Sequence, residues 1–235
     1  MKKLGVIGGM GPAASVLFYD MVTACTPAKK DQEHLPMVIL SHADMPDRTA
    51  SILGYPGAEP QEKVLELMTK DAEYLKMGGC EAMAVTCNTA HYFLDEVEKR
   101  SGLPVIHMIR LTAQAAASCD NASEAPVAIL ATEGTVKTGL YQNALTSFGA
   151  NYYVPEASVQ NTVTSLIYDK VKAGVLPTAE DWAPVDRAVK AAGCKCAILG
   201  CTELSVIRRA LALDPYYLDA MEVLAKACVA WSLNG

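Results

Sequence analysis

Two cysteines in this chain each close an apolar run and open a segment with helical spacing. The first lies in Val85-Thr86-Cys87-Asn88-Thr89-Ala90-His91, and the second lies in Leu199-Gly200-Cys201-Thr202-Glu203-Leu204-Ser205. In both, a pattern typical of a buried strand leads into a thiol that short polar residues follow. The carboxyl ends of parallel strands line the binding crevice of an open α/β sheet, so both thiols are predicted at such a crevice.

Strand patterns alternate with helical patterns along the chain, which is typical of parallel sheets with helices on both faces. The strands are predicted at 4–7, 37–40, 82–86, 105–107, 127–130, 151–154, 196–199 and 216–218. The helices include 12–25, 157–173, 178–192 and 220–233, with a loop at 41–49 and a polar link at 120–124. Because the strand that ends in a cysteine occurs twice, we predict an α/β fold of two pseudo-symmetric lobes with the active site in the cleft between them.

The composition suits a globular protein with a buried core. The chain has 235 residues, of which 51 % are hydrophobic, and a formal net charge of −6. This charge disfavours non-specific binding to nucleic acid or to an anionic membrane surface. The start Met1-Lys2-Lys3-Leu4-Gly5 passes directly into an apolar strand without the pattern of a signal peptide, so we expect a cytoplasmic protein.

A glycine-rich turn follows the first predicted strand, at Gly8-Gly9-Met10-Gly11-Pro12. It can be read as a dinucleotide-binding fingerprint, but the acidic residue expected at the end of the second strand is missing. A small anion at the start of the helix that begins at Pro12 fits the turn equally well.

The other six cysteines indicate packing rather than chemistry. Cys25, Cys80, Cys119 and Cys228 lie in apolar or helical patterns, where a free cysteine behaves as a small hydrophobic residue. Cys194 and Cys196 fit the alternation of a strand start, and no paired Cys-x-x-Cys or histidine stands at ligand spacing. We therefore expect no metal site.

Two thiols in equivalent places suit proton transfer at a stereocentre. Inversion needs one group to remove a proton and another to supply one from the opposite face, and a thiolate with a thiol can exchange these roles. A helix start next to each cysteine favours the thiolate and should lower the thiol pKa, while Asn88, Thr89 and Thr202 can cap the helices. Cys87 and Cys201 are thus predicted to be the two bases of a cofactor-independent amino-acid racemase.

The loop after the second strand carries one guanidinium, in Pro46-Asp47-Arg48-Thr49-Ala50. Loops at this end of α/β sheets often contact ligands. From the spacing alone, Arg48 is either such a contact or a solvated surface residue.

The chain resembles the aspartate/glutamate racemase superfamily, and within it the aspartate racemase group. The resemblance rests on the order and spacing of the segments already quoted around residues 7–12, 46–50, 87–91 and 200–203, and of two further segments. These are Thr26-Pro27-Ala28-Lys29-Lys30-Asp31-Gln32-Glu33-His34 and Val171-Lys172-Ala173-Gly174. The resemblance runs over nearly the whole chain.

The resemblance implies a racemase that works without pyridoxal phosphate (PLP) or any other cofactor, interconverts L- and D-aspartate, and is a homodimer. It implies that Cys87 and Cys201 are the acid/base pair, that Arg48 pairs with the side-chain carboxylate, that Lys172 supplies a second cation and that Glu203 meets the substrate ammonium. The substrate-binding residues so implied are Met10, Asp47, Arg48, Thr49, Asn88, Thr89, Ala90, Thr135, Lys172, Thr202 and Glu203. The family's topology places 1–102 and 209–235 in the first lobe and 103–208 in the second.

Three other functions remain open from the sequence. The first is a glutamate racemase or a broad-specificity amino-acid racemase, because one methylene in a pocket is worth only about 1–3 kcal/mol. The second is a non-catalytic protein that binds small dicarboxylates or phosphates, although a binder has no need of two thiols. The third is a dinucleotide-dependent oxidoreductase.

Overall fold

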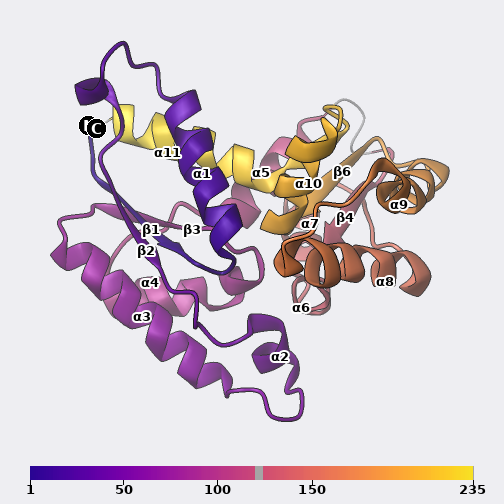
Figure 1. Cartoon of the computed structure of the whole chain (residues 1–235), viewed down its shortest axis with the longest axis horizontal. Coiled ribbons are helices and arrows are strands. Elements are labelled where there is room, and N and C mark those ends of the chain that lie inside the picture. Colours follow the sequence, from indigo (N-terminus) through magenta and orange to yellow (C-terminus); the bar gives the residue numbers. More distant parts are fainter. Residues whose placement is uncertain (120–123, 235) are drawn as a thin grey trace. The chain divides into compact units, whose positions relative to one another are not determined.

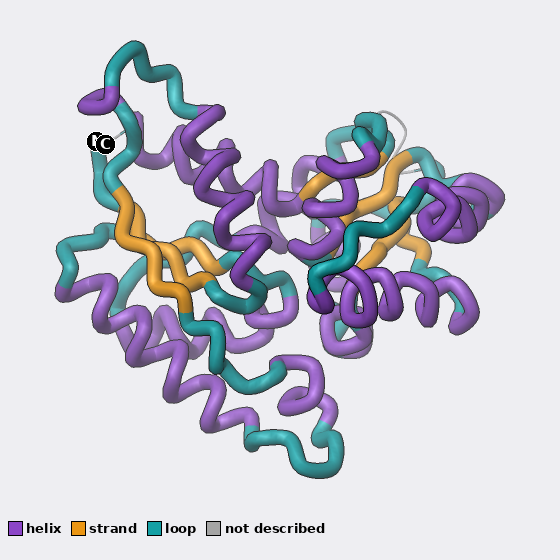
Figure 2. Tube along the Cα trace, viewed as in Figure 1, coloured by secondary structure: helices purple, strands orange, loops and turns teal. Residues whose placement is uncertain are grey.

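The chain forms two compact α/β units, each built on a parallel sheet, as predicted. The structure is a computed structural model that describes residues 1–119 and 124–234. Unit 1 comprises Met1–Met108 and Met221–Gly235, and unit 2 comprises Ile109–Ala220. Most of the polar link predicted at 120–124 lies outside the described residues. Figure 1 labels the elements, and Figure 2 shows that helices cover the strands of each unit.

The sheet of unit 1 has the strand order β2-β1-β3, with both pairs parallel. Its strands are β1 (Leu4–Gly8), β2 (Met37–Ser41) and β3 (Ala82–Val85). All residues of β1 and β3 are buried, as continuous apolar runs predict for strands with helices on both faces. Val105 adds one parallel bridge to Met83 on the outer side of β3.

Helices cover both faces of this sheet (Figure 1). One face carries α3 (Gln61–Met77) and α4 (Leu94–Ser101), whose apolar side chains form one cluster with Ile7, Met83 and Val85. The other face carries α1 (Pro12–Cys25) and α11 (Ala220–Leu233), and Ser232 of α11 is hydrogen-bonded to the backbone of Lys2. The remaining elements of unit 1 are α2 (Arg48–Leu53) and the short helices η1 (Asp31–Glu33) and η2 (Thr89–Phe93).

The sheet of unit 2 has the order β5-β4-β6-β7, again all parallel. Its strands are β4 (Val127–Ala131), β5 (Tyr152–Tyr153), β6 (Cys196–Gly200) and β7 (Tyr217–Asp219). Leu130 of β4 and Leu199 of β6 pack in one apolar cluster with three helices. These are α8 (Ala157–Ser165), α9 (Ala179–Ala191) and α10 (Thr202–Leu211). The unit also contains α5 (Met108–Ala117), α6 (Glu133–Lys137) and α7 (Leu140–Ser147).

The two units repeat one strand order. If the Val105 bridge is counted as a fourth strand, each sheet runs second, first, third, fourth in chain order. Cys87 and Cys201 both follow the third strand of their sheet. The helix that starts after the fourth strand continues in the other unit, since α5 belongs to unit 2 beyond Met108 and α11 belongs to unit 1 beyond Ala220. The predicted pseudo-symmetry is therefore a repeat of topology.

Three details differ from the sequence prediction. The strand predicted at 105–107 is a single bridge, because Pro104 precedes it and α5 begins at Met108. The helix predicted over 157–173 is divided into α8, the π-helix η3 (Leu166–Lys170) and the 3-10 helix η4 (Val171–Ala173). The loop predicted at 41–49 ends in a helix, because α2 starts at Arg48.

The boundaries of the units also differ from those expected. Residues 103–108 lie in unit 1 because Val105 pairs with Met83, whereas we had assigned them to the second lobe. Residues 209–220 lie in unit 2 because β7 pairs with β6, whereas we had assigned them to the first lobe.

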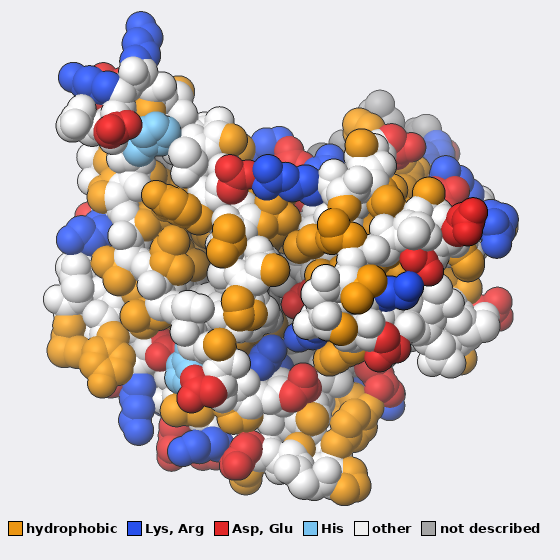
Figure 3. Space-filling model, in the orientation of Figure 1, with side chains coloured by type: hydrophobic (Ala, Val, Ile, Leu, Met, Phe, Trp, Pro, Cys, Tyr) orange, Lys and Arg blue, Asp and Glu red, His pale blue; other side chains and the backbone are white. Residues whose placement is uncertain are grey.

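Acidic and basic side chains are interspersed on the face shown in Figure 3, where no broad basic area stands out. Within residues 1–119 and 124–234, none of the helices is both long enough and apolar enough to cross a lipid bilayer. Within these residues, no three or more histidine, cysteine or acidic side chains are grouped so that they could hold a metal ion.

Candidate active site

In unit 1, the segment before Cys87 is tied to the glycine turn that follows β1. The Thr86 backbone N–H donates to Ile7 O at 3.1 Å, and the Thr86 hydroxyl is hydrogen-bonded to Ser15 Oγ, also at 3.1 Å. Ser15 in turn accepts the Gly9 N–H at 2.9 Å. That N–H would face the anion in a phosphate-binding turn, but here a protein hydroxyl already takes it. The turn therefore serves to fix the end of β3.

Gly9 allows the backbones that follow β1 and β2 to approach each other closely. Its φ is +86°, and a Cβ at this position would lie 2.5 Å from the His42 backbone nitrogen. Only glycine meets both conditions without a shift of the chain. Met10, the next residue, is buried in the same apolar cluster as Cys87 and Ala90.

Cys87 is 6 % exposed and is followed by η2, which contains Thr89 and Ala90. Asn88, Thr89 and Ala90 are all buried. The prediction that Asn88 caps the following helix is wrong, because it occupies the N-cap position of η2 with helical backbone angles and its side chain makes no capping hydrogen bond.

His91 is the last residue of the Cys87 motif, and the sequence alone does not predict a role for it. Its ring is 3 % exposed and lies between two backbone groups, with Nδ1 2.8 Å from Cys87 O and Nε2 3.2 Å from the Met108 nitrogen. Burial, and secondarily the charge of His107, lower the pKa of His91 to about 3. The four-residue spacing from Cys87 was the one available signal, since such pairs share a helix face.

The motif that contains Arg48 is a short capped helix. Asp47 is the N-cap of α2, and its Oδ1 accepts the Ala50 N–H at 2.8 Å. The solvated-surface interpretation of Arg48 is wrong, because the residue is 7 % exposed and its Nη1 donates to Met45 O at 2.9 Å and Pro46 O at 2.8 Å. Thr49 is also buried, and α2 contacts η2. The fold of unit 1 thus brings α2, which begins at Arg48, into contact with the short helix that follows Cys87.

A histidine–aspartate pair at the end of β2 was missed from the sequence. His42 Nδ1 lies 2.7 Å from Asp71 Oδ2, and His42 Nε2 lies 3.6 Å from Asp44 Oδ1. Burial raises the pKa of Asp71, and this outweighs the opposite effect of His42. Residues from β2 and α3, distant in sequence, form this pair, so no local pattern could reveal it.

In unit 2, Cys201 is 6 % exposed and its thiol faces an acidic side chain. Its Sγ donates to Glu203 Oε2 at 3.0 Å, and the Thr202 hydroxyl donates to the same oxygen at 3.3 Å. Burial, followed by the negative charge of Glu203, raises the pKa of the Cys201 thiol well above its usual range. The prediction that the helix start lowers this pKa is therefore wrong, because desolvation and Glu203 outweigh it.

Lys172 completes this group from η4. Its Nζ is 3.7 Å from Glu203 Oε1 and 5.0 Å from the centroid of the Tyr168 ring. Glu203 thus contacts Cys201, Thr202 and Lys172, although we had predicted that it meets the substrate ammonium. Thr202 was predicted to cap α10, but Cys201 occupies the N-cap position and Thr202 is the first helical residue.

Thr135 lies in α6, the short helix that follows β4, and β4 is the strand that pairs with β6. Ala131 is opposite Gly200 in this pairing, so the segments that begin at Thr132 and Cys201 leave the sheet side by side. The hydroxyls of Thr132 and Thr135 are 3.0 Å apart, and Thr132 caps α6 through the Thr135 N–H. Both side chains are buried, and the role of Thr135 at the substrate stays a prediction.

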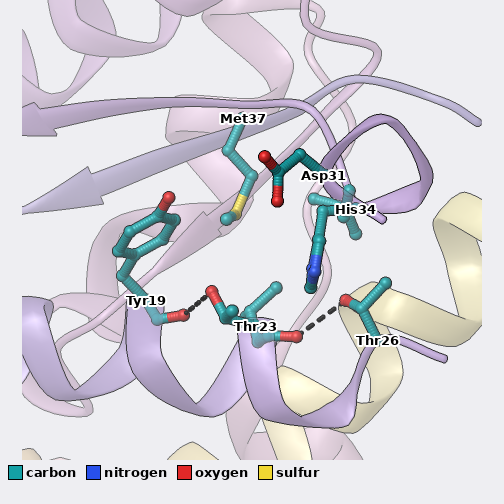
Figure 4. Close-up of a pocket in the computed structure, with 8 residues that line it drawn as sticks. Tyr19, Thr23, Thr26, Asp31, His34 and Met37 are labelled. Atoms are coloured by element: carbon teal, nitrogen blue, oxygen red, sulfur yellow. Dashed lines mark hydrogen bonds between the residues drawn. The ribbon is translucent and has the colours of Figure 1, made fainter. Parts of the chain in front are cut away.

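A cavity of about 270 Å³ lies at the opposite, amino end of the unit 1 sheet (Figure 4). It is bordered by the end of α1 and the first residue of β2, and includes Thr26, Asp31 and His34 of the motif at 26–34. None of the predicted site residues lines it. The cavity and the cysteine site are therefore separate features of unit 1.

The chain matches the family model described as Asp/Glu/Hydantoin racemase over residues 7–228. It therefore belongs to the Asp/Glu/hydantoin racemase family, and the resemblance seen in the sequence is confirmed. As a member of a racemase family, it is assigned to the isomerases.

Two curated relatives in this family differ in substrate. The chain is 24 % identical over 155 residues to the broad specificity amino-acid racemase RacX of Bacillus subtilis, with 62 % of this chain and 61 % of RacX covered. It is 30 % identical over 98 residues to the glutamate racemase of Aquifex aeolicus, with 41 % of this chain and 38 % of that protein covered. Both matches span less than two thirds of the relative.

A solved structure, the Picrophilus torridus aspartate racemase, matches this chain along almost its whole length. The TM-score is 0.81 and the sequence identity is 27 %, with 99 % of this chain and 94 % of that chain covered. This similarity confirms the predicted fold of two parallel sheets flanked by helices.

Proposed function

We propose that this protein interconverts L- and D-aspartate without PLP, with Cys87 and Cys201 as the two bases. The observation that carries the proposal is the equivalent position of the two thiols, each buried and each within two residues of the end of the third strand of its sheet. Racemisation by proton transfer needs one base for each face of the α-carbon. The proposal therefore requires both thiols to reach the same substrate carbon.

In the proposed reaction, the Cys87 thiolate removes the α-proton of one enantiomer and the Cys201 thiol donates its proton to the other face. The C–H electron pair passes into the α-carbon and its carboxylate as an enolate, and returns to form the new C–H bond. The thiolate and thiol have then exchanged places, and the reverse reaction uses them in the opposite order. Glu203 and the raised pKa of Cys201 support the assignment of Cys201 as the protonated partner at rest.

The proposed substrate contacts follow from charge and burial. Arg48 is buried at the start of α2, a helix that contacts η2, and would pair with the side-chain carboxylate. Asn88, Thr89 and Ala90 would lie at the α-carboxylate. Lys172 supplies a second cation. Glu203 is assigned to the Cys201 proton, because its carboxylate already contacts that thiol.

Aspartate is preferred because the Picrophilus torridus aspartate racemase matches almost the full length of this chain at 27 % identity. A glutamate or broad-specificity racemase is the second candidate, supported by the similarity to RacX and to the Aquifex aeolicus enzyme. The two candidates differ in the pocket by one methylene, worth about 1–3 kcal/mol.

The test is incubation of the reduced protein with L-aspartate in D₂O, without PLP, metal or nucleotide, followed by proton NMR and chiral chromatography. We expect loss of the α-proton signal together with formation of D-aspartate. A parallel incubation with L-glutamate separates the two racemase candidates by their relative kcat/KM. Absence of exchange with either amino acid would contradict the proposal.

Arg48→Ala tests the proposed carboxylate contact. We expect KM for aspartate to rise at least about tenfold, since a charge-assisted hydrogen bond is worth roughly 1.5–3 kcal/mol. Arg100→Ala is the matched control, because Arg100 forms only exposed pairs with Glu62 and Glu96. Equal kinetics of the two variants would remove Arg48 from the substrate site.

A further inference from the structure

His91 joins two backbone groups that are far apart in sequence. One ring nitrogen contacts the carbonyl of Cys87, and the other contacts the N–H of Met108, the last residue of unit 1 before the chain continues into unit 2. The ring of His107 packs against it edge to face, with 4.9 Å between centroids. At 3 % exposure, His91 has little access to water for either nitrogen.

These two contacts fix the tautomer of the ring. A carbonyl oxygen only accepts hydrogen bonds, so Nδ1 must carry the proton that it donates to Cys87 O. A backbone N–H only donates, so Nε2 must offer its lone pair to Met108. A proton on Nε2 would place two N–H groups against each other. Only the neutral ring with the proton on Nδ1 satisfies both partners.

The Cys87 carbonyl belongs to the peptide unit between Cys87 and Asn88. This unit is planar, so a hydrogen bond to its oxygen also orients the Asn88 N–H and the Cα that carries the Cys87 side chain. His91 therefore acts on the Cys87 thiol through the backbone, without contact to the sulfur or to a substrate.

We propose that His91 is a positioning residue that holds the Cys87 thiol in register with the start of α5, where the chain leaves unit 1. This inference rests on the proposed racemase function for its catalytic consequence. The structural link between Cys87 and Met108 does not depend on that function. We refer to this link, Cys87 O to His91 to Met108 N, as the His91 brace.

Two conservative substitutions divide the brace into its halves. Asparagine places an amide near the position of Nδ1, so His91→Asn can keep the donor to Cys87 O while it loses the acceptor for Met108. Glutamine places its amide near the position of Nε2, so His91→Gln can keep the acceptor for Met108 while it loses the donor to Cys87. The two variants remove one buried hydrogen bond each and therefore carry similar structural costs.

The first experiment compares kcat, KM and thermal unfolding for the two variants. We expect kcat to fall by roughly ten- to a hundredfold in His91→Gln and by no more than about threefold in His91→Asn, because a misplaced catalytic group costs rate rather than affinity. KM should stay close to wild type in both. If kcat falls equally in both variants and follows their melting temperatures, His91 is only a structural residue and the proposal is wrong.

The second experiment measures the thiols directly. Iodoacetamide labelling followed by mass spectrometry gives separate rates for Cys87 and Cys201, so Cys201 is an internal reference in the same molecule. In His91→Gln we expect the Cys87 rate to change by roughly fivefold or more while the Cys201 rate stays constant, since thiol reactivity follows local environment. His34→Gln, on a histidine outside the site, is the control that should change neither rate.

The third experiment reads the tautomer from the imidazole ¹⁵N shifts of His91. We expect a neutral ring protonated on Nδ1 between about pH 5 and pH 8. A ring protonated on Nε2, or a charged ring in that range, would overturn the brace. If the tautomer and the labelling result hold but no racemisation occurs, the proposed function fails while the brace stands.

Discussion

The two candidate thiols have the same place in their sheets but different neighbours. Cys201 donates to a carboxylate, and that carboxylate pairs with Lys172 at the surface of unit 2. In unit 1, Cys87 is held through its carbonyl by the neutral ring of His91. Charge thus acts on one thiol, while backbone geometry acts on the other.

This difference has a chemical consequence for a two-base racemase. Two identical sites would favour the same protonation state for both thiols, whereas the reaction needs one thiolate and one thiol. Glu203 stabilises the protonated form of Cys201, because a carboxylate next to a thiolate is unfavourable and a carboxylate next to a thiol accepts a hydrogen bond. A repeated fold therefore supplies two unequal thiols.

The largest expected effect tests whether the two thiols depend on each other. Cys87→Ser and Cys201→Ser should each reduce racemisation by roughly 10³-fold or more, because each thiol serves one face of the α-carbon and serine is a far weaker acid. The rates are measured in both directions by chiral chromatography.

Cys80→Ser is the matched control, because Cys80 is a buried cysteine just before β3 of the same unit. It should keep racemisation near the wild-type rate. If Cys87→Ser or Cys201→Ser also kept racemisation near the wild-type rate, the mechanism would not need both thiols and the two-base assignment would be wrong.

The sequence predicted the elements that depend on local pattern. The bounds of α1 and α11 agree with the prediction, because Pro12 begins one helix and an apolar pattern defines the other. The continuous apolar runs that end at Cys87 and Cys201 are buried strands. The motif resemblance identified the family, which the family match confirmed.

Features that depend on partners distant in sequence could not be predicted. The motif around Cys201 does not reveal that the Glu203 carboxylate pairs with Lys172. His91 needed the position of Met108, and Asp71 needed the position of His42. The break of the helix at 166–173 has no signal in the apolar spacing, which continues through it.

The second prediction concerns the pH dependence of stability that the neutral His91 ring causes. Because the folded pKa of His91 is about 3, the unfolded chain binds one more proton than the folded chain between about pH 6.5 and pH 3. This residue should therefore lower the free energy of unfolding by about 1.4 kcal/mol for each pH unit below 6.5. His91→Gln lacks this proton uptake.

Urea unfolding of wild type and His91→Gln at pH 7, 6 and 5 gives the difference between their free energies of unfolding. The contributions of the other titrating groups are common to both proteins and cancel in this difference. We expect the variant to be less stable than wild type at pH 7. The difference in their free energies of unfolding should become smaller as the pH falls. If this difference stays constant or grows between pH 7 and pH 5, the His91 ring becomes charged in the folded protein and the prediction is wrong.

The third prediction concerns the carboxylate beside Cys201. Glu203→Gln removes a negative charge that raises the thiol pKa, so the thiolate fraction of Cys201 at a given pH should increase. In a Cys87→Ser background, iodoacetamide labelling of Cys201 at pH 8 should become about tenfold faster, because the thiolate is the form that reacts. In otherwise wild-type protein, the variant should leave the labelling rate of Cys87 unchanged. A slower Cys201 reaction would show that Glu203 promotes the thiolate.

The smallest effect distinguishes the two charges that act on Cys201. Lys172 opposes Glu203, since its positive charge lowers the thiol pKa, but its side chain is partly exposed and pairs with Glu203 at 3.7 Å. Lys172→Met should therefore slow Cys201 labelling by only about twofold, because water screens an exposed charge. Lys170→Met is the control, because Lys170 pairs with Asp181 instead of Glu203. If Lys172→Met instead accelerated Cys201 labelling as much as Glu203→Gln does, the two residues would act on the thiol as one ion pair. The negative charge of Glu203 would then not explain how Cys201 differs from Cys87.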